Sequence, residues 1–299
     1  MFASNSPIQK NILAWYFKEK RDLPWRITTD PYKILVSEIM LQQTQVDRVI
    51  PKYNSFLKQF PTTKSLAEAQ TADVLKSWSG LGFNRRALRL QDISKKINAL
   101  KKFPETEKEL LQLKGIGPYT ASAVCSFAYN QNVAVLDTNI RRVFHRIFFK
   151  ENNKQNETLT KELELIAEKL LPHGQSRDWH NALMDLGATI CTAQTPKCSQ
   201  CPVASQCQFE KIIKTKTKEE QETLFALTRI KNKQGTFKNS NRFYRGRILD
   251  YLRKEETVEQ QTLLKEFKEK YQKDISFILI ELEKDKLIAI KKVTISLPN

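Results

Sequence analysis

Four cysteines lie close together near residue 200 and form the pattern C-x6-C-x2-C-x5-C, from Cys191 through Cys198 and Cys201 to Cys207. Four thiolates in one short loop are typical of a metal or cluster site, because a reducing compartment disfavours disulfides there. Zinc ribbons have two close cysteine pairs separated by a dozen or more residues, whereas only the middle pair is close here. The spacing therefore favours a cubane [4Fe–4S] cluster over zinc.

A single acidic residue, Glu38, lies within the apolar and amide-rich stretch PYKILVSEIMLQQTQV at 31–46. Helical spacing puts it beside an apolar face, where removal from water would favour its protonated form and suit it to general-acid catalysis. Uncharged donors and acceptors suited to base edges follow it: Gln42, Gln43 and Thr44. The alternative is an ordinary solvated acid at a polar helix end.

A Gly-x-Gly turn, Gly115 and Gly117, joins two helical stretches within LKGIGPYTASAV at 113–124. Glycines let backbone amides approach a phosphate, and the following helix N-terminus adds its dipole, so the segment predicts a helix-hairpin-helix that grips DNA backbone. Asp137, in VLDTNIRRV, begins a later helix and would direct a carboxylate at that DNA. The alternatives are a tight corner without ligand and a simple helix N-cap.

The whole chain is basic: 50 Lys and Arg stand against 33 Asp and Glu in 299 residues, a net charge of +17. This excess favours a polyanionic partner. Only 8 residues are glycine, which argues against glycine-dense phosphate loops, propellers and many-turned β sandwiches. The N-terminus lacks a signal-peptide pattern and no stretch has 18 consecutive apolar residues, so we expect a cytoplasmic, nucleoid-associated protein with no membrane partner.

Helical periodicity predicts an all-α domain over 1–211, with the cysteine loop at 191–207. The expected helices are 7–18, 31–41, 44–59, 64–78, 85–100, 105–113, 119–129, 137–149, 158–171 and 177–190. A charged linker is expected at 212–238 and a small winged-helix domain at 239–299. The latter would have helices at 245–253, 257–271 and 274–284 and a hairpin at 287–296. The basic, aromatic stretch at 231–247 adds grip on phosphates or is simply a solvated linker and first helix.

The order and distances of hairpin, aspartate and cysteine loop resemble the helix-hairpin-helix DNA glycosylase superfamily, the group of endonuclease III, whose fold has two helical subdomains. The resemblance covers about residues 7–210. Within that group, five segments resemble the MutY-type adenine DNA glycosylases. They are LPWR (23–26), SEIMLQQTQV (37–46), GLG with a following aromatic (80–83), VLDTNIRRV (135–143) and ALMDLGATIC (182–191).

The resemblance implies hydrolysis of the N-glycosidic bond of a flipped-out adenine mispaired with 8-oxoguanine or guanine. Glu38 matches the acid that protonates the leaving base, and Asp137 matches the carboxylate that stabilises the oxocarbenium ion. Tyr119 occupies the position of the nucleophilic lysine of lyases. A tyrosine forms no Schiff base, so a monofunctional glycosylase is expected.

The resemblance also implies contacts with the substrate. Trp25 and Arg26 would line the adenine pocket, and Asp185 would reach the exocyclic amine. Gln43 and Phe83 would wedge into the stack near the opposite base, and Asn139 would brace the catalytic aspartate. Phe83 replaces the usual tyrosine, Asn84 a common aromatic, and Trp179-His180-Asn181 the usual Phe-Asn-Gln.

The C-terminus departs most from the family, because 212–299 is too short and too helical for the usual Nudix-like domain that recognises 8-oxoguanine. We expect a monomer that binds duplex DNA with a mismatched or oxidised base pair. Two alternatives stay open: a thymine or uracil mismatch glycosylase of the same fold, and a non-catalytic DNA-binding protein. The glutamate with its LQQTQ segment favours adenine, and retention of both carboxylates disfavours the binding protein.

Overall fold

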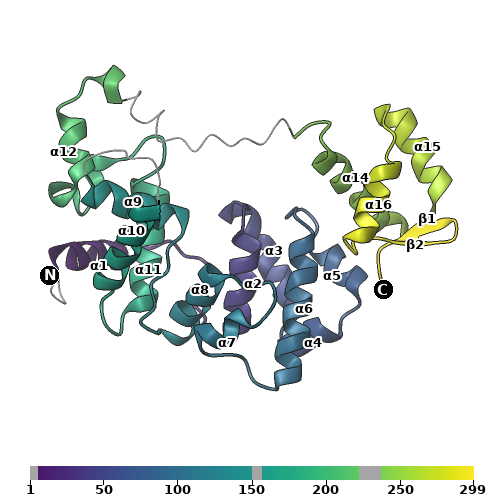
Figure 1. Cartoon of the computed structure of the whole chain (residues 1–299), viewed down its shortest axis with the longest axis horizontal. Helices are drawn as coiled ribbons and strands as arrows, with labels where there is room; N and C mark the ends of the chain where they lie inside the picture. Colours follow the sequence, from purple (N-terminus) through teal and green to yellow (C-terminus); the bar gives the residue numbers. More distant parts are fainter. Residues whose placement is uncertain (1–5, 150–156, 222–236) are drawn as a thin grey trace. The chain divides into compact units, whose positions relative to one another are not determined.

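The computed structural model describes residues 6–149, 157–221 and 237–299. The chain divides into two compact units (Figure 1). Unit 1 comprises residues 1–34, 105–112 and 116–231, and unit 2 comprises 35–104, 113–115 and 232–299. The described residues are mostly helical, which confirms the expected all-α architecture.

Among the residues that the structure describes, unit 1 contains seven labelled α-helices and three short helical turns. Its α-helices are α1 (Pro7–Glu19), α7 (Glu107–Leu111), α8 (Pro118–Tyr129), α9 (Thr138–Phe148), α10 (Glu157–Lys169), α11 (Ser176–Asp185) and α12 (Gln208–Lys214). A π-helical turn, η1 (Leu186–Ile190), continues α11, and two 3-10 turns, η2 (Cys198–Gln200) and η3 (Ala204–Gln206), lie in the cysteine loop.

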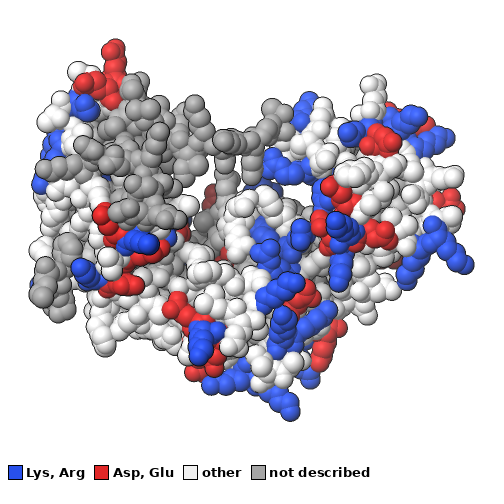
Figure 2. All heavy atoms as spheres, in the orientation of Figure 1, with Lys and Arg blue, Asp and Glu red and all other residues white. Residues whose placement is uncertain are grey.

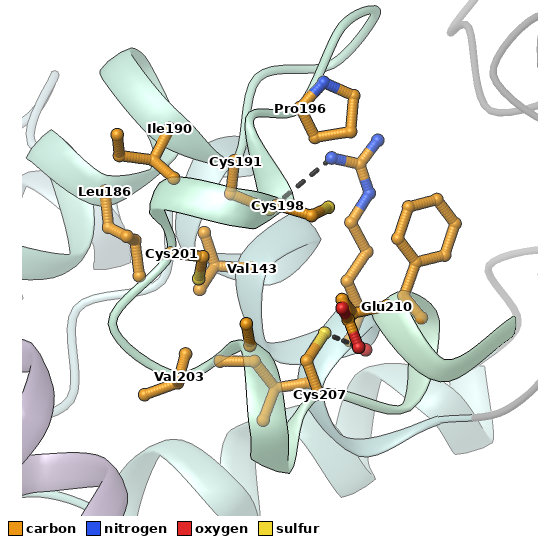
Figure 3. A pocket seen from close by; sticks show the side chains of 14 residues that line it. Val143, Leu186, Ile190, Cys191, Pro196, Cys198, Cys201, Val203, Cys207 and Glu210 are labelled. Carbon is orange, nitrogen blue, oxygen red and sulfur yellow. Dashed lines mark hydrogen bonds between the residues drawn. The ribbon is translucent and has the colours of Figure 1, made fainter. Parts of the chain in front are cut away.

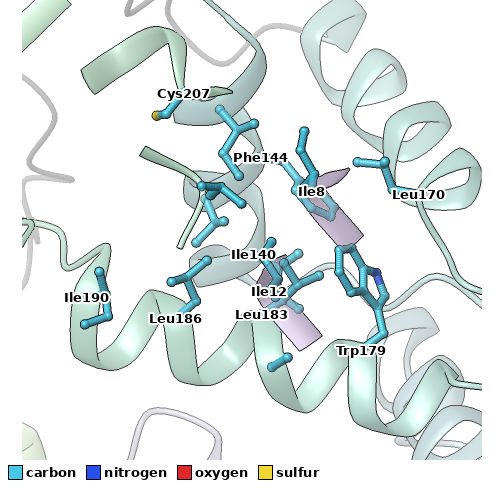
Figure 4. Close-up of a cluster of buried hydrophobic side chains, with 14 of the residues drawn as sticks. Ile8, Ile12, Ile140, Phe144, Leu170, Trp179, Leu183, Leu186, Ile190 and Cys207 are labelled. Atoms are coloured by element: carbon cyan, nitrogen blue, oxygen red, sulfur yellow. The ribbon is translucent and has the colours of Figure 1, made fainter. Parts of the chain in front are cut away.

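The core of unit 1 forms where α1, α9 and α11 pack their apolar faces together (Figure 4). Ile12, Phe144 and Trp179 are fully buried in it. Helix α1 starts sharply because Ser6 and Gln9 form a capping box, each side chain bonding the other's backbone amide. Cys207 lies at the edge of the same cluster, so the cysteine loop is anchored on this core.

Unit 2 begins with five helices: α2 (Pro31–Leu41), most of which lies in this unit, α3 (Val46–Gln59), α4 (Thr63–Glu68), α5 (Thr71–Ser77) and α6 (Arg85–Leu100). The single helix expected at 64–78 is wrong, because the chain is extended at Ala69 and Gln70 and starts a new helix at Thr71. Gln91, buried on α6, donates to the carbonyl of Ala69 at 2.8 Å and so satisfies this break.

The C-terminal part of unit 2 has the order α14 (Asn241–Glu255), β1 (Thr257–Glu259), α15 (Gln260–Tyr271), α16 (Ser276–Lys284), β2 (Ala289–Lys291) and β3 (Thr294–Ser296). The strands form an antiparallel sheet in the order β1-β3-β2, with Val258 and Ile290 both opposite Ile295. The predicted terminal hairpin is present. The helix expected from 257 is wrong at its start, because the first three residues pair with β3 as a strand. The name winged helix remains our proposal for this segment.

The expected linker at 212–238 is described only in part. Residues 212–214 belong to α12, a helical stretch covers 218–221, and 222–236 lies outside the described residues. Among the helices that the structure describes, none is long and apolar enough to cross a membrane.

Candidate active site

The four cysteines of the loop surround one cavity in unit 1 (Figure 3). Cys191 follows the π-helical turn, Cys198 and Cys201 flank a 3-10 turn, and Cys207 is the N-cap of α12. The cavity between the side chains has a volume of about 20 Å³. Apolar side chains, including Leu186, form much of the remaining wall, as a cluster buried from water requires.

The chemistry of these residues fits a [4Fe–4S] cluster. Arg146 lies against the cavity with its Nη1 atom 3.4 Å from Cys191 Sγ, where its charge would offset an anionic cluster. Burial raises the pKa of the Cys198 thiol to about 11 and that of Cys201 to about 12. Iron binding must therefore displace protons from thiols that are neutral without it. Among the described side chains, no three of ligand type come close enough together to hold a single ion.

Asp137 is the N-cap of α9, and its carboxylate is tied down at both oxygens. Oδ1 accepts from the backbone amide of Ile140 at 2.6 Å, and Oδ2 accepts from Asn139 Nδ2 at 3.0 Å. Burial raises the pKa of Asp137, while these hydrogen bonds and the charge of Arg142 pull it back. The predicted contact between Asn139 and the aspartate is present, and the N-cap role is also real.

Arg142, which the sequence does not single out, connects Asp137 to the cysteine loop. Its Nη1 donates to Asn139 Oδ1 at 2.9 Å, and its Nε donates to the carbonyl of Cys191 at 3.0 Å. Its Nη2 donates to the carbonyl of Gly187 at 2.7 Å. A Cβ at Gly187 would lie 3.0 Å from the Asn139 side chain, so glycine permits this close approach. The guanidinium of Arg142 therefore bonds both Cys191 of the cysteine loop and Asn139, which in turn bonds Asp137.

Asp185 is fully buried and forms ion pairs with two arginines. Arg26 bonds it in bidentate fashion at 2.6 and 2.8 Å, and Arg21 adds its Nε at 2.5 Å. Burial pushes the pKa of Asp185 up, but the hydrogen bonds and charges of Arg26 and Arg21 outweigh it and hold the pKa below its usual range. Asp185 is therefore anionic, and it orients Arg26 next to buried Trp25.

The hairpin lies between α7 and α8, with Gly117 as N-cap of α8 and Tyr119 half-buried in its first turn. Gly115 has φ +108°, a conformation that only glycine adopts without strain. A Cβ there would also lie 2.6 Å from the Arg89 side chain. The exposed turn therefore depends on Gly115 for both its backbone angle and its space, while nothing lies within 4 Å of a Cβ at Gly117.

In unit 2, Glu38 is 6% exposed, the burial expected of an acid on an apolar helix face. The two residues expected to wedge into DNA, Gln43 and Phe83, have left-handed backbones with φ of 56° and 46°. Such angles cost free energy for residues other than glycine and persist only where the surroundings impose them. Phe83 is 45% exposed, so its ring is available to a ligand.

A buried arginine that the sequence does not reveal, Arg86, fixes both of these loops. Its Nη1 donates to carbonyls at the end of α2 and its Nη2 to the 80–84 loop and to Thr44. The partners are Ile39 (3.0 Å), Met40 (2.9 Å), Gln42, Thr44 Oγ1 (2.9 Å), Leu81 (3.2 Å) and Gly82 (3.1 Å). Burial, with the charge of Arg89, lowers its pKa to about 10, so it remains cationic at neutral pH.

We expect Arg86→Met to lower the free energy of unfolding by about 3 kcal/mol, because several buried carbonyls lose their donor. The free energy of unfolding of Arg86→Lys should lie between those of Arg86→Met and the wild type, since an ammonium keeps the charge without the planar, forked guanidinium. Urea titration followed by circular dichroism measures the change. Arg85→Met, at a neighbouring side chain that is 68% exposed, is the matched control. Equal stability of Arg86→Met and wild type would contradict the bracing role.

Comparison with known proteins adds the family. Residues 36–169 match the model of the HhH-GPD superfamily of base excision DNA repair proteins, and 191–207 match the iron–sulfur binding domain of endonuclease III. An adenine DNA glycosylase of Mycolicibacterium smegmatis is 38% identical over 253 residues, which cover 84% of this chain and 81% of the relative. The chain belongs to the adenine DNA glycosylase family.

A second adenine DNA glycosylase and a solved structure are also similar to this chain. The Mycobacterium tuberculosis adenine DNA glycosylase is 43% identical over 64% of this chain, and the alignment spans only 64% of that relative's length. A solved thermostable thymine-DNA glycosylase is 31% identical with a TM-score of 0.64, over 69% of this chain and 95% of that one. The iron–sulfur match spans all four cysteines, so a [4Fe–4S] cluster is the cofactor of this adenine glycosylase family member.

His180 is 1% exposed in unit 1. Its Nε2 accepts from the amide of Val135 at 3.0 Å, which leaves Nδ1 to donate to the carbonyl of Ser176 at 2.8 Å. The ring therefore holds the segment that leads into Asp137. Burial lowers the pKa of His180 to about 4, so this histidine is neutral at physiological pH.

We expect stability to fall as the pH drops from 6.5 to about 4, because the unfolded chain binds a proton at His180 that the folded chain excludes. The loss amounts to about 3 kcal/mol. His145, whose pKa burial also lowers, contributes with the same sign. The test compares the slope of the unfolding free energy against pH in His180→Asn and in the wild type. His173 is exposed, so His173→Asn is the control. An unchanged slope in His180→Asn would refute the assignment.

Proposed function

We propose that this protein is an adenine DNA glycosylase of base-excision repair. It hydrolyses the N-glycosidic bond of adenine mispaired with 8-oxoguanine or guanine and leaves an abasic site. The observation that carries the proposal is a pair of carboxyl groups in contrasting environments, within this family. Glu38 is 6% exposed on an apolar helix, whereas Asp137 accepts two hydrogen bonds at a helix N-terminus.

The two carboxyl groups divide the chemistry between them. Adenine is a poor leaving group, so Glu38 gives a proton to an imidazole-ring nitrogen as the bond from the base to the sugar breaks. The electron pair of that bond leaves with adenine, and the sugar becomes an oxocarbenium ion. Asp137, as the carboxylate, stabilises this cation. Water then adds to the sugar and loses a proton, and the product is an abasic site with free adenine.

Binding of the DNA uses the hairpin and the pocket residues. Amides of the Gly115–Gly117 turn and the α8 N-terminus contact phosphate, while Trp25 and Arg26 line the adenine pocket. Asp185 reaches the exocyclic amine of adenine. Its ion pairs with Arg21 and Arg26 support a second role, in which Asp185 orients Arg26. Gln42, Gln43, Thr44 and Phe83 face the mispaired duplex. We propose that the protein acts as a monomer.

The position of Tyr119 supports a monofunctional enzyme, because a phenol forms no imine with the sugar. When bound, the cluster supplies iron–thiolate bonds that hold the 191–207 loop together. Cys191, Cys198, Cys201 and Cys207 hold it. Arg142 then keeps Asn139 against Asp137, so the loop sets the direction of the aspartate.

A thymine or uracil mismatch glycosylase of the same fold is the alternative to be excluded, and a solved thymine-DNA glycosylase has a similar fold. One assay separates the candidates. Purified protein is incubated with duplexes that contain A:8-oxoguanine, A:G, T:G, U:G or A:T, and alkali then cleaves abasic sites. We expect cleavage of the adenine strand opposite 8-oxoguanine and guanine. Cleavage confined to T:G or U:G would overturn the adenine assignment, and no cleavage at all would favour a binding protein.

A further inference from the structure

A large groove lies within unit 2, between the loops that follow α2 and α5 and one face of α14. Its volume is about 1020 Å³. Its charged lining residues are six arginines: Arg48, Arg85, Arg86, Arg89, Arg242 and Arg245. None of the described residues that line it is acidic. Figure 2 shows Lys and Arg side chains gathered over the region where Figure 1 places α6.

One face of α14 forms a wall of this groove. Arg242, Arg245, Gly246 and Leu249 follow the spacing of a single helix face. Nothing lies within 4 Å of a Cβ at Gly246, so the glycine keeps this wall open. The helix is held in place by Arg253, which donates to the carbonyl of Leu75 at 3.2 Å and to Asn84 Oδ1 at 2.7 Å.

The arginines that line the groove favour binding of an anion with several negative charges. Arg245 is bonded to Asp285 and lies 3.6 Å from Glu281, and Arg85 lies 3.4 Å from Asp285. These two carboxylates lie beside two of the six arginines, and neither of them lines the groove itself. A repeating phosphodiester backbone supplies such charge along the length of a groove.

The groove also presents groups that suit bases. Phe237 is 60% exposed, forms a T-shaped contact with Phe243 with ring centroids 5.8 Å apart, and has the Arg242 guanidinium 5.9 Å from its ring centroid. Phe83, 45% exposed, and the amides of Gln42 and Gln43 lie on the opposite wall. Exposed rings interleaved with arginines are typical of surfaces that stack unpaired or distorted bases of a nucleic-acid strand.

We propose that this groove binds the DNA strand opposite the excised adenine, with Arg242 on its phosphates and Phe237 stacked on a base. The proposal rests on the proposed function and adds a role for the C-terminal segment. Gln43 and Phe83 are the residues expected beside the opposite base, and the α14 face shares their groove. The C-terminal segment thus contacts the strand that carries 8-oxoguanine.

The first test measures affinity without catalysis. The full chain is titrated with a duplex that carries 2′-fluoro-2′-deoxyadenosine, which resists hydrolysis, opposite 8-oxoguanine. Arg242→Gln should weaken binding about 5- to 10-fold and lower the slope of log affinity against log salt by about one. Arg247→Gln is the matched control, because this arginine is on the same helix but lies over the Phe243 ring instead of lining the groove. Equal effects of the two variants would refute the proposal.

The second test identifies the strand. A photoreactive p-benzoylphenylalanine placed at position 237 should cross-link to the strand that carries 8-oxoguanine. The same group at exposed Phe277 on α16 should cross-link to neither strand. Cross-linking from position 237 to the adenine strand, or to no strand, would overturn the proposal. Adenine excision by the wild-type chain is measured in parallel, so a failed function and a failed groove give different results.

Discussion

We expect Glu38→Gln to abolish adenine excision while duplex binding persists. Glutamine has the shape of glutamate, but its amide does not give a proton to the departing base at any working pH. General-acid catalysis contributes roughly 10²- to 10⁴-fold, and we expect the loss in single-turnover rate to lie at the upper end because adenine leaves poorly without protonation. Rapid-quench measurement with an A:8-oxoguanine duplex gives the rate, and titration with the non-hydrolysable duplex gives the affinity.

The matched control for this substitution is Glu68→Gln, at the end of α4. The Glu68 side chain is 61% exposed and forms only a long pair with Lys64 at 4.0 Å. It should excise adenine at the wild-type rate. Full activity of Glu38→Gln would remove Glu38 from the mechanism, and a large loss in both variants would point to damage of the fold.

We expect Asp137→Asn to lower the single-turnover rate by about 10²- to 10³-fold, because the charge proposed to stabilise the oxocarbenium ion is lost. Asparagine is as good an N-cap as aspartate, so α9 should begin at the same residue and stability should change little. The rate is compared with the melting temperature of the same preparation. If Asp137→Asn has the melting temperature of the wild type and also excises adenine at the wild-type rate, the electrostatic role of Asp137 is contradicted.

The pH dependence of excision tests the same residue. In the proposed mechanism Asp137 acts in its ionised form, and burial raises the pKa of this carboxyl group. Activity should therefore fall as the pH drops through a value above the ordinary range of an aspartate. Asn139→Ala removes a donor that favours the carboxylate, so it should move this acid limb to still higher pH. If the acid limb of the pH–activity profile of Asn139→Ala stays at the wild-type pH, Asn139 has no influence on the ionisation of Asp137.

Local patterns in the sequence predicted the local structure around the candidate residues where these residues are close together in the chain. The cysteine spacing within 191–207 matched the iron–sulfur family, and the position of Asp137 at the start of a helix was correct. The burial of Glu38 followed from the apolar residues at helical spacing around it. These features depend on helix geometry, which repeats every few residues and can be read directly from the order of side chains.

Arg86 and Arg142 were missed for the opposite reason. Arg86 bonds carbonyls that lie more than forty residues earlier in the chain, and Arg142 bonds Cys191, 49 residues later. An arginine on a helix is usually solvated, and no local pattern shows that its guanidinium is buried. The sequence signal that could have identified these two arginines is a basic residue in an otherwise apolar helix turn beside a proposed site.

Asp185 and the C-terminal segment show a further limit. The sequence identified Asp185 by its resemblance to a family position, but its bidentate pair with Arg26 depends on residues 159 positions apart. The strand at Thr257–Glu259 was read as helix, because three residues are too few for a period and the strand exists only by pairing with β3. Tertiary contacts decided both outcomes.

The central claim is that a proton from Glu38 releases adenine from a mispaired duplex. Its most direct test is mass spectrometry of the free base released from A:8-oxoguanine and T:G duplexes by the wild type and by Glu38→Gln. We predict free adenine from the first duplex with the wild type alone, and an intact T:G duplex throughout. Release of thymine, or equal release of adenine by Glu38→Gln, would contradict the account.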